Sequence, residues 1–194
     1  MAVITQTIQP GERRNEVTEM QKALISLGAH IAPGELFTAT TAGTYGPTTQ
    51  AAIIAFLDRV GLPHVNPQPF NASIGRLLNI AVGAEVGNSA ALQKAVRESF
   101  AAIQTAPVAG PSELVWHARY AAIGLDFTTA RKIIAMIPSN SQPEILEEKA
   151  KIASIVMQST LQPPEPELVN QENNYTFLYG YVSRSTIDRM LRGT

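Results

Sequence analysis

The stretch GTYGPTTQAAIIAF, residues 43–56, decides the fold of the N-terminal part of the chain. Two glycines frame a tyrosine, and Pro47 follows, which suits the first turn of a helix because its missing N–H costs nothing there. Apolar residues then recur at helical spacing: Ala52, Ile53, Phe56 and Val60. The stretch predicts a tight turn that starts a helix, whose first free amides Thr48 or Thr49 can satisfy.

Two more helices are expected around this one. The first has its apolar residues on one face, at Val17, Met20, Leu24 and Leu27. Asn15 is its predicted N-cap, and Gly28 is predicted to end it. The other helix is predicted in FNASIGRLLN, residues 70–79, with Asn71 as its cap; it follows the helix stop VGLP at residues 60–63. Residues 29–42 show no helical period and are read as a loop.

The second half of the chain is also helical by pattern. A stripe formed by Leu92, Val96, Phe100 and Ile103 lies behind Ser89, the predicted cap, and TAPVAGPS at residues 105–112 breaks it. Helices are expected at residues 113–123 and 128–137. Another is expected after SQPE, residues 141–144, which has capping-box spacing. Within that last helix, Glu147 and Lys151 stand one turn apart as a favourable pair.

The C-terminal end differs in composition. QPPEPE, residues 162–167, is rich in proline and acid, which predicts an extended, exposed connector. The residues beyond it concentrate aromatic and arginine side chains, as a protein-docking segment does. Packing on the same chain is the alternative reading of this tail. The candidate docking residues are Tyr175, Tyr179, Tyr181, Arg184 and Arg189.

The sequence therefore predicts an all-α protein in three parts. Residues 1–84 form a small three-helix domain, residues 85–161 a helical domain, and residues 162–194 the connector and docking segment. The chain has 194 residues, a formal net charge of -1 and no cysteine. Near-neutral charge argues against nucleic-acid binding, and the missing thiols exclude disulfides, thiolate metal sites and a cysteine nucleophile. No stretch is long and apolar enough to span a bilayer.

The order helix, loop, GTYG turn, helix, GLP and helix resembles the peptidoglycan-binding-like domain family over residues 9–84. The matching stretches are VTEMQKALISLG at residues 17–28, the GTYG stretch itself, VGLP and FNASIGRLLN. This chain departs from the family pattern where Leu57 follows Phe56 in place of glutamine. HVNPQPF, residues 64–70, also replaces the second turn of the family, and the loop before Tyr45 is long. The resemblance implies a three-helix fold and binding of cell-wall glycan.

If the wall-binding function holds, four residues near the turn and the edge of the second helix are the candidate ligand contacts: Tyr45, Gln50, Arg59 and His64. They bring polar or stacking groups to that surface. Tyr45 either packs beneath the turn or faces a ligand, and both readings stay open at the level of sequence.

No catalytic constellation is recognised. His30, His64 and His117 show no metal-binding spacing, so neither a metal site nor any cofactor is expected. The available carboxylates, such as Glu113 and Glu148, are read as helix caps or solvated charges. Serine catalysis would require His117 near a serine and a carboxylate, and no GxSxG elbow is present. Trp116 is read as a core residue.

We therefore expect a non-catalytic protein that binds or targets peptidoglycan. The alternative is a structural or adaptor subunit that uses the same fold as a scaffold for protein partners or for a homo-oligomer. The first residues lack the pattern of a secretory signal peptide. This favours a protein that is cytoplasmic as made or built into a phage, injection or toxin-delivery particle acting at the cell envelope.

Overall fold

The computed structural model describes residues 7–106 and 109–161. Within these residues the chain forms seven α-helices and no strand, which confirms the all-α prediction. The chain divides into two compact units, residues 1–87 and residues 88–194. We call them unit 1 and unit 2 and describe each by itself.

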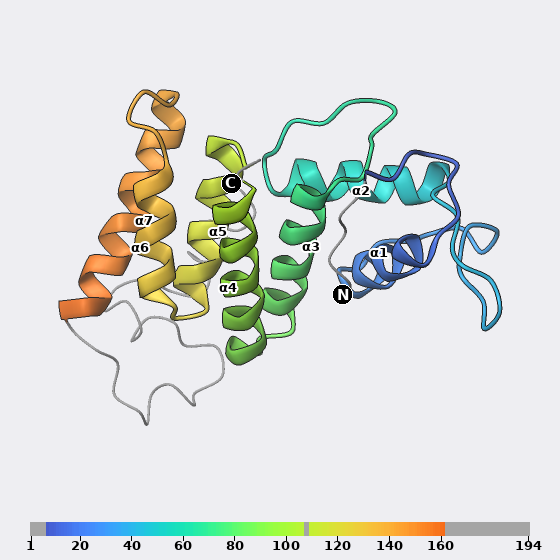
Figure 1. The fold of residues 1–194 in the computed structure, drawn as a ribbon, viewed down its shortest axis with the longest axis horizontal. Coiled ribbons are helices and arrows are strands. Elements are labelled where there is room, and N and C mark those ends of the chain that lie inside the picture. The colour runs from blue at the N-terminus through green and yellow to red at the C-terminus, as the bar shows by residue number, and fades with distance from the viewer. Residues whose placement is uncertain (1–6, 107–108, 162–194) are drawn as a thin grey trace. The chain divides into compact units, whose positions relative to one another are not determined.

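Unit 1 is built from α1 (Asn15–Ser26), α2 (Pro47–Arg59) and α3 (Ala72–Glu85), and α1 contacts both of the others (Figure 1). Two isolated β-bridges add to this core: Ile8 pairs with Phe70, and Arg13 pairs with Thr44. They attach the segment before α1 to the turn before α2 and to the start of α3. The largest fully buried side chains of unit 1 are Tyr45, Phe70, Ile8, Met20, Leu24, Ile53, Leu77, Leu78 and Ile80.

The ends of α1 and α3 follow the sequence only in part. Asn15 is the first residue of α1 and not its cap, because Arg14 holds the extended N-cap position, from which its side chain makes no capping hydrogen bond. Gly28 ends α1 as predicted, with a left-handed φ of 88° that favours glycine. Asn71 caps α3 as predicted, because its Oδ1 accepts a hydrogen bond from the Ile74 amide at 3.0 Å.

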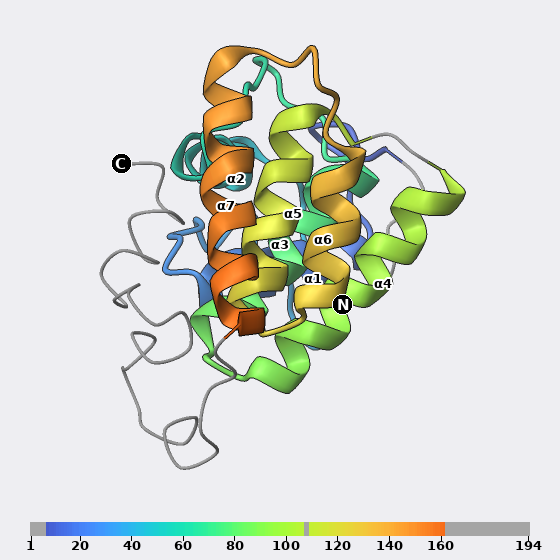
Figure 2. The same cartoon turned by 90° about the vertical axis from the view of Figure 1, so that its left-hand side faces the viewer.

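Unit 2 contains α4 (Ser89–Thr105), α5 (Pro111–Ile123), α6 (Phe127–Met136) and α7 (Pro143–Leu161). Its centre is α5, which contacts the other three helices, while α6 and α7 run side by side (Figure 2). Every residue of α5 from Glu113 onward is buried, Trp116 included, so the core role predicted for Trp116 is confirmed.

In unit 2 the predicted cap of α4 is wrong by one residue, and the predicted ion pair on α7 is present. Asn88 caps α4 and accepts a hydrogen bond from the Ala91 amide, whereas Ser89, the predicted cap, is already helical. The pair one turn apart on α7 is confirmed, since Lys151 Nζ lies 2.9 Å from Glu147 Oε1.

The five candidate docking residues of the C-terminal segment lie outside the described residues. They are Tyr175, Tyr179, Tyr181, Arg184 and Arg189.

Candidate functional site

The turn before α2 is occupied by a carboxylate of the chain itself. The N-cap residue, Gly46, has no side chain, and Glu35 from the preceding loop takes over the capping role. Its two oxygens accept hydrogen bonds from the amides of Thr48 and Thr49 and from the Thr49 hydroxyl, each at 2.8 Å. The prediction that Thr48 or Thr49 satisfies these amides is therefore wrong, because the acceptor is Glu35.

The electrostatics of Glu35 agree with this geometry. Burial by itself raises the pKa of the carboxyl group, but the hydrogen bonds from Thr48 and Thr49 favour the ionised form and outweigh it. The net result is a pKa below the ordinary glutamate value. A helix N-terminus is a general anion-binding position, and in α2 that position is filled.

Both glycines of the turn are required by neighbouring side chains. A Cβ atom on Gly46 would lie 2.4 Å from Cδ of Glu35, and one on Gly43 would lie 2.1 Å from Oε1 of Gln21. Gln21 is fully buried, and its Nε2 donates to the carbonyl oxygens of Glu35 and Thr44 and to Oγ1 of Thr49, at 2.9–3.1 Å. The glycine-framed turn therefore encloses Glu35 and Gln21, and it leaves no cradle for an external ligand.

Tyr45 lies beneath the turn and not at a ligand surface. Its side chain has no exposed area, and its hydroxyl donates a hydrogen bond to the Gln68 carbonyl oxygen. Its amide donates to the Glu12 carbonyl oxygen at 2.8 Å. The sequence left open whether Tyr45 packs beneath the turn or faces a ligand. In the structure Tyr45 packs beneath the turn, so it is not a ligand contact.

Replacing Tyr45 with phenylalanine tests this placement. The variant should lose about 1 kcal/mol of stability, since the buried Gln68 carbonyl loses its donor. Burial raises the pKa of Tyr45 to about 12, so an alkaline titration of phenolate absorbance should lose a late component in the variant. Loss of a component near the ordinary tyrosine pKa of about 10, in place of the late one, would show that Tyr45 is accessible and that the placement is incorrect.

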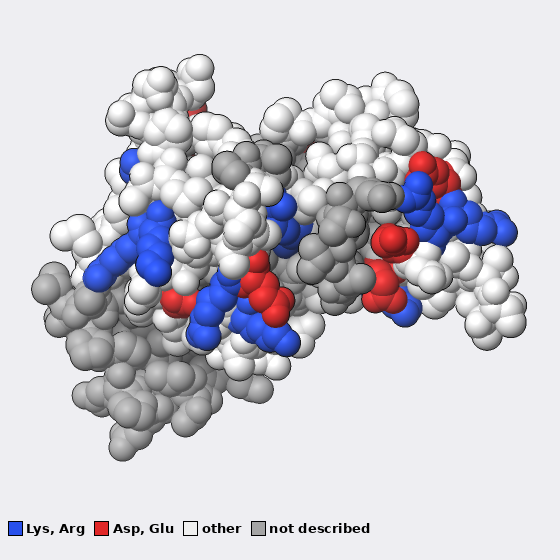
Figure 3. Space-filling model, in the orientation of Figure 1, with Lys and Arg blue, Asp and Glu red and all other residues white. Residues whose placement is uncertain are grey.

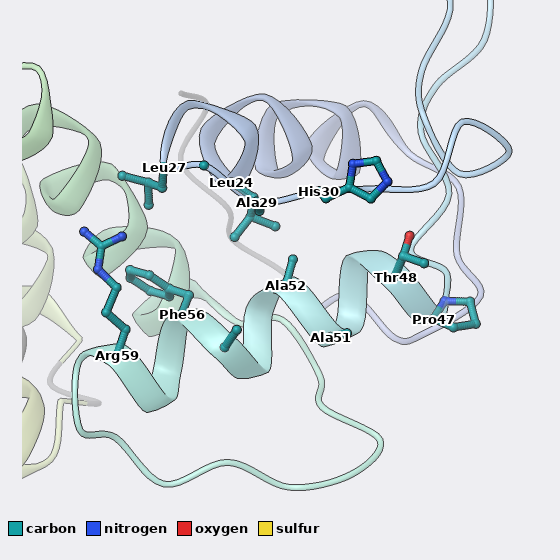
Figure 4. A pocket seen from close by; sticks show the side chains of 12 residues that line it. Leu24, Leu27, Ala29, His30, Pro47, Thr48, Ala51, Ala52, Phe56 and Arg59 are labelled. Carbon is teal, nitrogen blue, oxygen red and sulfur yellow. The ribbon is translucent and has the colours of Figure 1, made fainter.

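A groove runs along α2, between this helix and the end of α1. Its volume is about 540 Å³, and one wall is the face of α2 that extends from Pro47 to Arg59. The other wall is the end of α1 with the residues that follow it (Figure 4). The lining residues are Leu24, Leu27, Gly28, Ala29, His30, Pro47, Thr48, Ala51, Ala52, Ala55, Phe56 and Arg59.

The middle and the two ends of the groove differ in chemistry. Ala51, Ala52 and Ala55 form the α2 side of the middle, and their small size leaves the groove open. His30 and Thr48 lie at one end, and Arg59 lies with Phe56 and Leu27 at the other (Figure 4). The wall that carries His30 is attached to α2, since the Ala32 amide donates to Thr48 Oγ1 at 2.9 Å.

Of the candidate ligand contacts predicted from sequence, Arg59 lines this groove. Gln50 and His64 do not line it, and each bonds to another residue of unit 1. Nε2 of Gln50 donates to Oδ1 of Asn66 at 2.8 Å, and Nε2 of His64 lies 3.0 Å from Oδ1 of Asp58. The structure therefore separates residues that the sequence placed in one site.

Unit 2 holds a serine, a histidine and a carboxylate in one hydrogen-bonded row, which no sequence motif indicated. Ser99 Oγ lies 3.0 Å from Nδ1 of His117, and Nε2 of His117 lies 3.3 Å from Oε1 of Glu113. Their residues are only 4%, 0% and 7% exposed, respectively. A substrate carbonyl cannot reach Ser99 in this arrangement, so the row acts as a buried polar element of the helix core.

Neither a cluster of metal ligands nor a membrane span marks a further site in the part of the chain that the structure describes. No group of three or more potential metal ligands occurs within residues 7–106 and 109–161. None of the described helices is long and apolar enough to cross a membrane. On the face shown in Figure 3, basic side chains occur in several separate groups, some of them with acidic side chains beside them. The groove of unit 1 is thus the candidate site.

Comparison with known proteins adds no relative: no family model, curated protein or solved structure matches the chain. The class that the fold establishes is an all-α protein of two helical units, and the function has to be argued from the groove itself.

Proposed function

We propose that this chain is a non-catalytic binding protein and that the groove of unit 1 is its ligand site, with peptidoglycan as the ligand. The observation that carries the proposal is the groove's construction: alanines along one helix, apolar residues opposite, and an arginine at one end. Its volume falls within the usual range for ligand sites, roughly 300–1,000 Å³.

The dimensions of the groove suit a linear ligand. From Thr48 to Arg59 the groove follows α2 for about 16 Å, taking roughly 1.5 Å per helical residue. An extended chain of about five residues has that length. Peptidoglycan consists of linear glycan chains with short peptides, which carry methyl groups and carboxylates. Methyl groups match the alanine-lined middle, and a carboxylate matches Arg59.

The resemblance of unit 1 to the peptidoglycan-binding-like family supports the same ligand, through the order of the motifs and not through individual contact residues. Because Glu35 and Gln21 occupy the space enclosed by the GTYG turn, the turn itself offers no ligand site. A groove beside the turn accommodates both observations, because the turn then serves to fix the start of α2 and the groove wall that α2 forms.

We propose a non-catalytic function because the groove lacks the acid, base and nucleophile that hydrolysis of the cell wall would need. None of its lining residues is an acid, and His30 has no serine or carboxylate among the other lining residues. The Ser99–His117–Glu113 row is closed to substrate. Purified protein incubated with cell-wall sacculi is therefore expected to release no soluble muropeptides.

Sedimentation with purified sacculi tests the binding function. Wild-type protein should pellet with sacculi, and Ala55→Trp should remain mostly soluble, with an affinity at least about tenfold lower because the indole fills the groove. Ala55 is exposed, so the fold should tolerate the change. The matched control is Ala101→Trp, which alters an exposed alanine of α4 and should bind as wild type does.

If wild-type protein does not pellet, wall binding is excluded, and the scaffold alternative becomes the better account. The filled turn favours that alternative, because unit 1 then uses its family-like features for folding alone. A structural or adaptor subunit should instead form stable assemblies with itself or with protein partners. In either case we propose a phage, injection or toxin-delivery particle as the setting.

A further inference from the structure

The charged end of the groove points to the kind of group that the ligand presents there. We infer that Arg59 receives a carboxylate of the ligand, and that Glu85 occupies Arg59 in the unliganded protein and is displaced on binding. This inference rests on the proposed function and names the part of the ligand that is recognised.

The lining of the groove carries one fixed charge, which is positive. Of the residues that line the groove, Arg59 is the one that keeps a full charge at every physiological pH, and none is acidic. A ligand that fills this groove therefore meets a single fixed positive charge, at the end formed by Phe56 and Leu27 (Figure 4). Arginine binds carboxylates with two parallel hydrogen bonds, which fix orientation as well as position.

The other position near the groove that could attract an anion is already occupied by Glu35. An anion would otherwise be attracted to the N-terminus of α2, at the other end of the groove. Glu35 already accepts the amides of Thr48 and Thr49 there, at 2.8 Å each. A carboxylate of the ligand is therefore directed to the Arg59 end.

Arg59 is held by an exposed ion pair with Glu85. A terminal nitrogen of its guanidinium bonds to Oε1 of Glu85, the last residue of α3. The two side chains are 40% and 49% exposed, so water screens the pair strongly. The Arg119–Glu148 pair of unit 2 differs, since Arg119 is only 6% exposed and Glu148 26% exposed, so water screens that pair less. A weak, solvated pair such as Arg59–Glu85 can be exchanged for a ligand carboxylate.

Glu85 then has a specific effect on affinity. Because it bonds to Arg59, it competes with the ligand for the guanidinium. Removing its charge while keeping its shape should therefore tighten ligand binding. Removing the charge of Arg59 should weaken it.

The experiment measures binding of the full chain to sacculi in two forms, untreated and with free carboxyl groups converted to amides. The variants are Arg59→Gln and Glu85→Gln. Matched controls are Lys22→Gln and Glu19→Gln, which remove the same charges from an exposed pair on α1 with an N···O distance of 2.7 Å, outside the groove.

On untreated sacculi, Arg59→Gln should bind about tenfold more weakly than wild type, and Glu85→Gln about threefold more tightly. Both controls should stay within about twofold of wild type. On amidated sacculi, wild type should fall to the level of Arg59→Gln, and the differences among the variants should disappear.

The inference is overturned if amidation leaves wild-type binding unchanged, if Lys22→Gln weakens binding as much as Arg59→Gln, or if Glu85→Gln weakens it. In those cases wild type still pellets, so the proposed function stands. If wild type does not pellet with untreated sacculi, the proposed function itself fails, and this inference fails with it.

Discussion

Glu35→Ala is expected to lower the free energy of unfolding of unit 1 by about 2–4 kcal/mol. The substitution removes three hydrogen bonds, from the amides of Thr48 and Thr49 and from the Thr49 hydroxyl, all at 2.8 Å. Loss of a helix cap costs about 1 kcal/mol, and hydrogen bonds to a charged group contribute more than neutral ones. No other side chain caps α2.

A chain of two compact units need not unfold in a single step, so a probe for unit 1 alone is needed. Native-state hydrogen exchange of the amides in α1 and α2 supplies it. Trp116, the lone tryptophan, lies in unit 2, so its fluorescence serves as an internal control and should not change at the same denaturant concentration. A loss of less than about 0.5 kcal/mol in unit 1 would show that Glu35 does not cap α2.

Glu35 should also make the stability of unit 1 depend on pH. The folded-state pKa of Glu35 lies below its ordinary value, so its stabilisation is fully present above the unfolded pKa, about 4.3. The stabilisation is lost as the pH falls from there through the lower, folded-state pKa. Glu35→Gln should lack this part of the acid sensitivity, while it retains some capping through its amide oxygen.

Gly43→Ala is expected to destabilise unit 1 by about 2–3 kcal/mol. The new Cβ would lie 2.1 Å from Oε1 of Gln21, so the Gln21 amide has to move. That amide is buried and donates to Glu35, Thr44 and Thr49, and its displacement breaks these hydrogen bonds inside the core. Gly34→Ala is the matched control, since nothing lies within 4 Å of its added Cβ.

A double-mutant cycle gives the sharper measurement. In a Gln21→Ala background the clash partner is gone, so adding Gly43→Ala should cost less than about 0.5 kcal/mol by hydrogen exchange. Additive losses would mean that Gly43 is required for another reason and that the packing of Gln21 against the turn is incorrectly described.

The sequence was sufficient for the helices because their signals are local. Apolar spacing places the core residues of α2 and α4, and Gly28 and Asn71 act within one turn of their own helices. The errors at Asn15 and Ser89 are shifts of one residue at a helix start. Several polar residues compete for the cap there, and the backbone angle of the preceding residue decides.

The role of Glu35 could not be predicted from its neighbours. It stands in a loop without period, and its partners Thr48 and Thr49 follow more than ten residues later. One signal was available: a helix that begins with Gly46 and Pro47 has no side chain at its N-cap, so its free amides need an acceptor from elsewhere. The sequence does not say which acidic residue supplies it.

The groove could not be predicted from the sequence either, because it depends on residues that are distant along the chain. Ala51, Ala52 and Ala55 lie on one face of α2, a pattern visible in AAIIA, but small residues indicate close packing as readily as an open groove. Only the position of the second wall, from Leu27 to His30, distinguishes the two. The Ser99–His117–Glu113 row likewise depends on how α4 packs on α5, which is tertiary information.

The central claim is that unit 1 binds its ligand in the groove and not at the turn or at Gln50 and His64. Titrating the isotope-labelled full chain with soluble muropeptides, while recording amide chemical shifts, tests this most directly. We predict the largest shifts at Gly28, His30, Ala55 and Arg59, all of which line the groove. Shifts confined to residues 61–68 or to unit 2, or no shifts at saturating muropeptide, would contradict it.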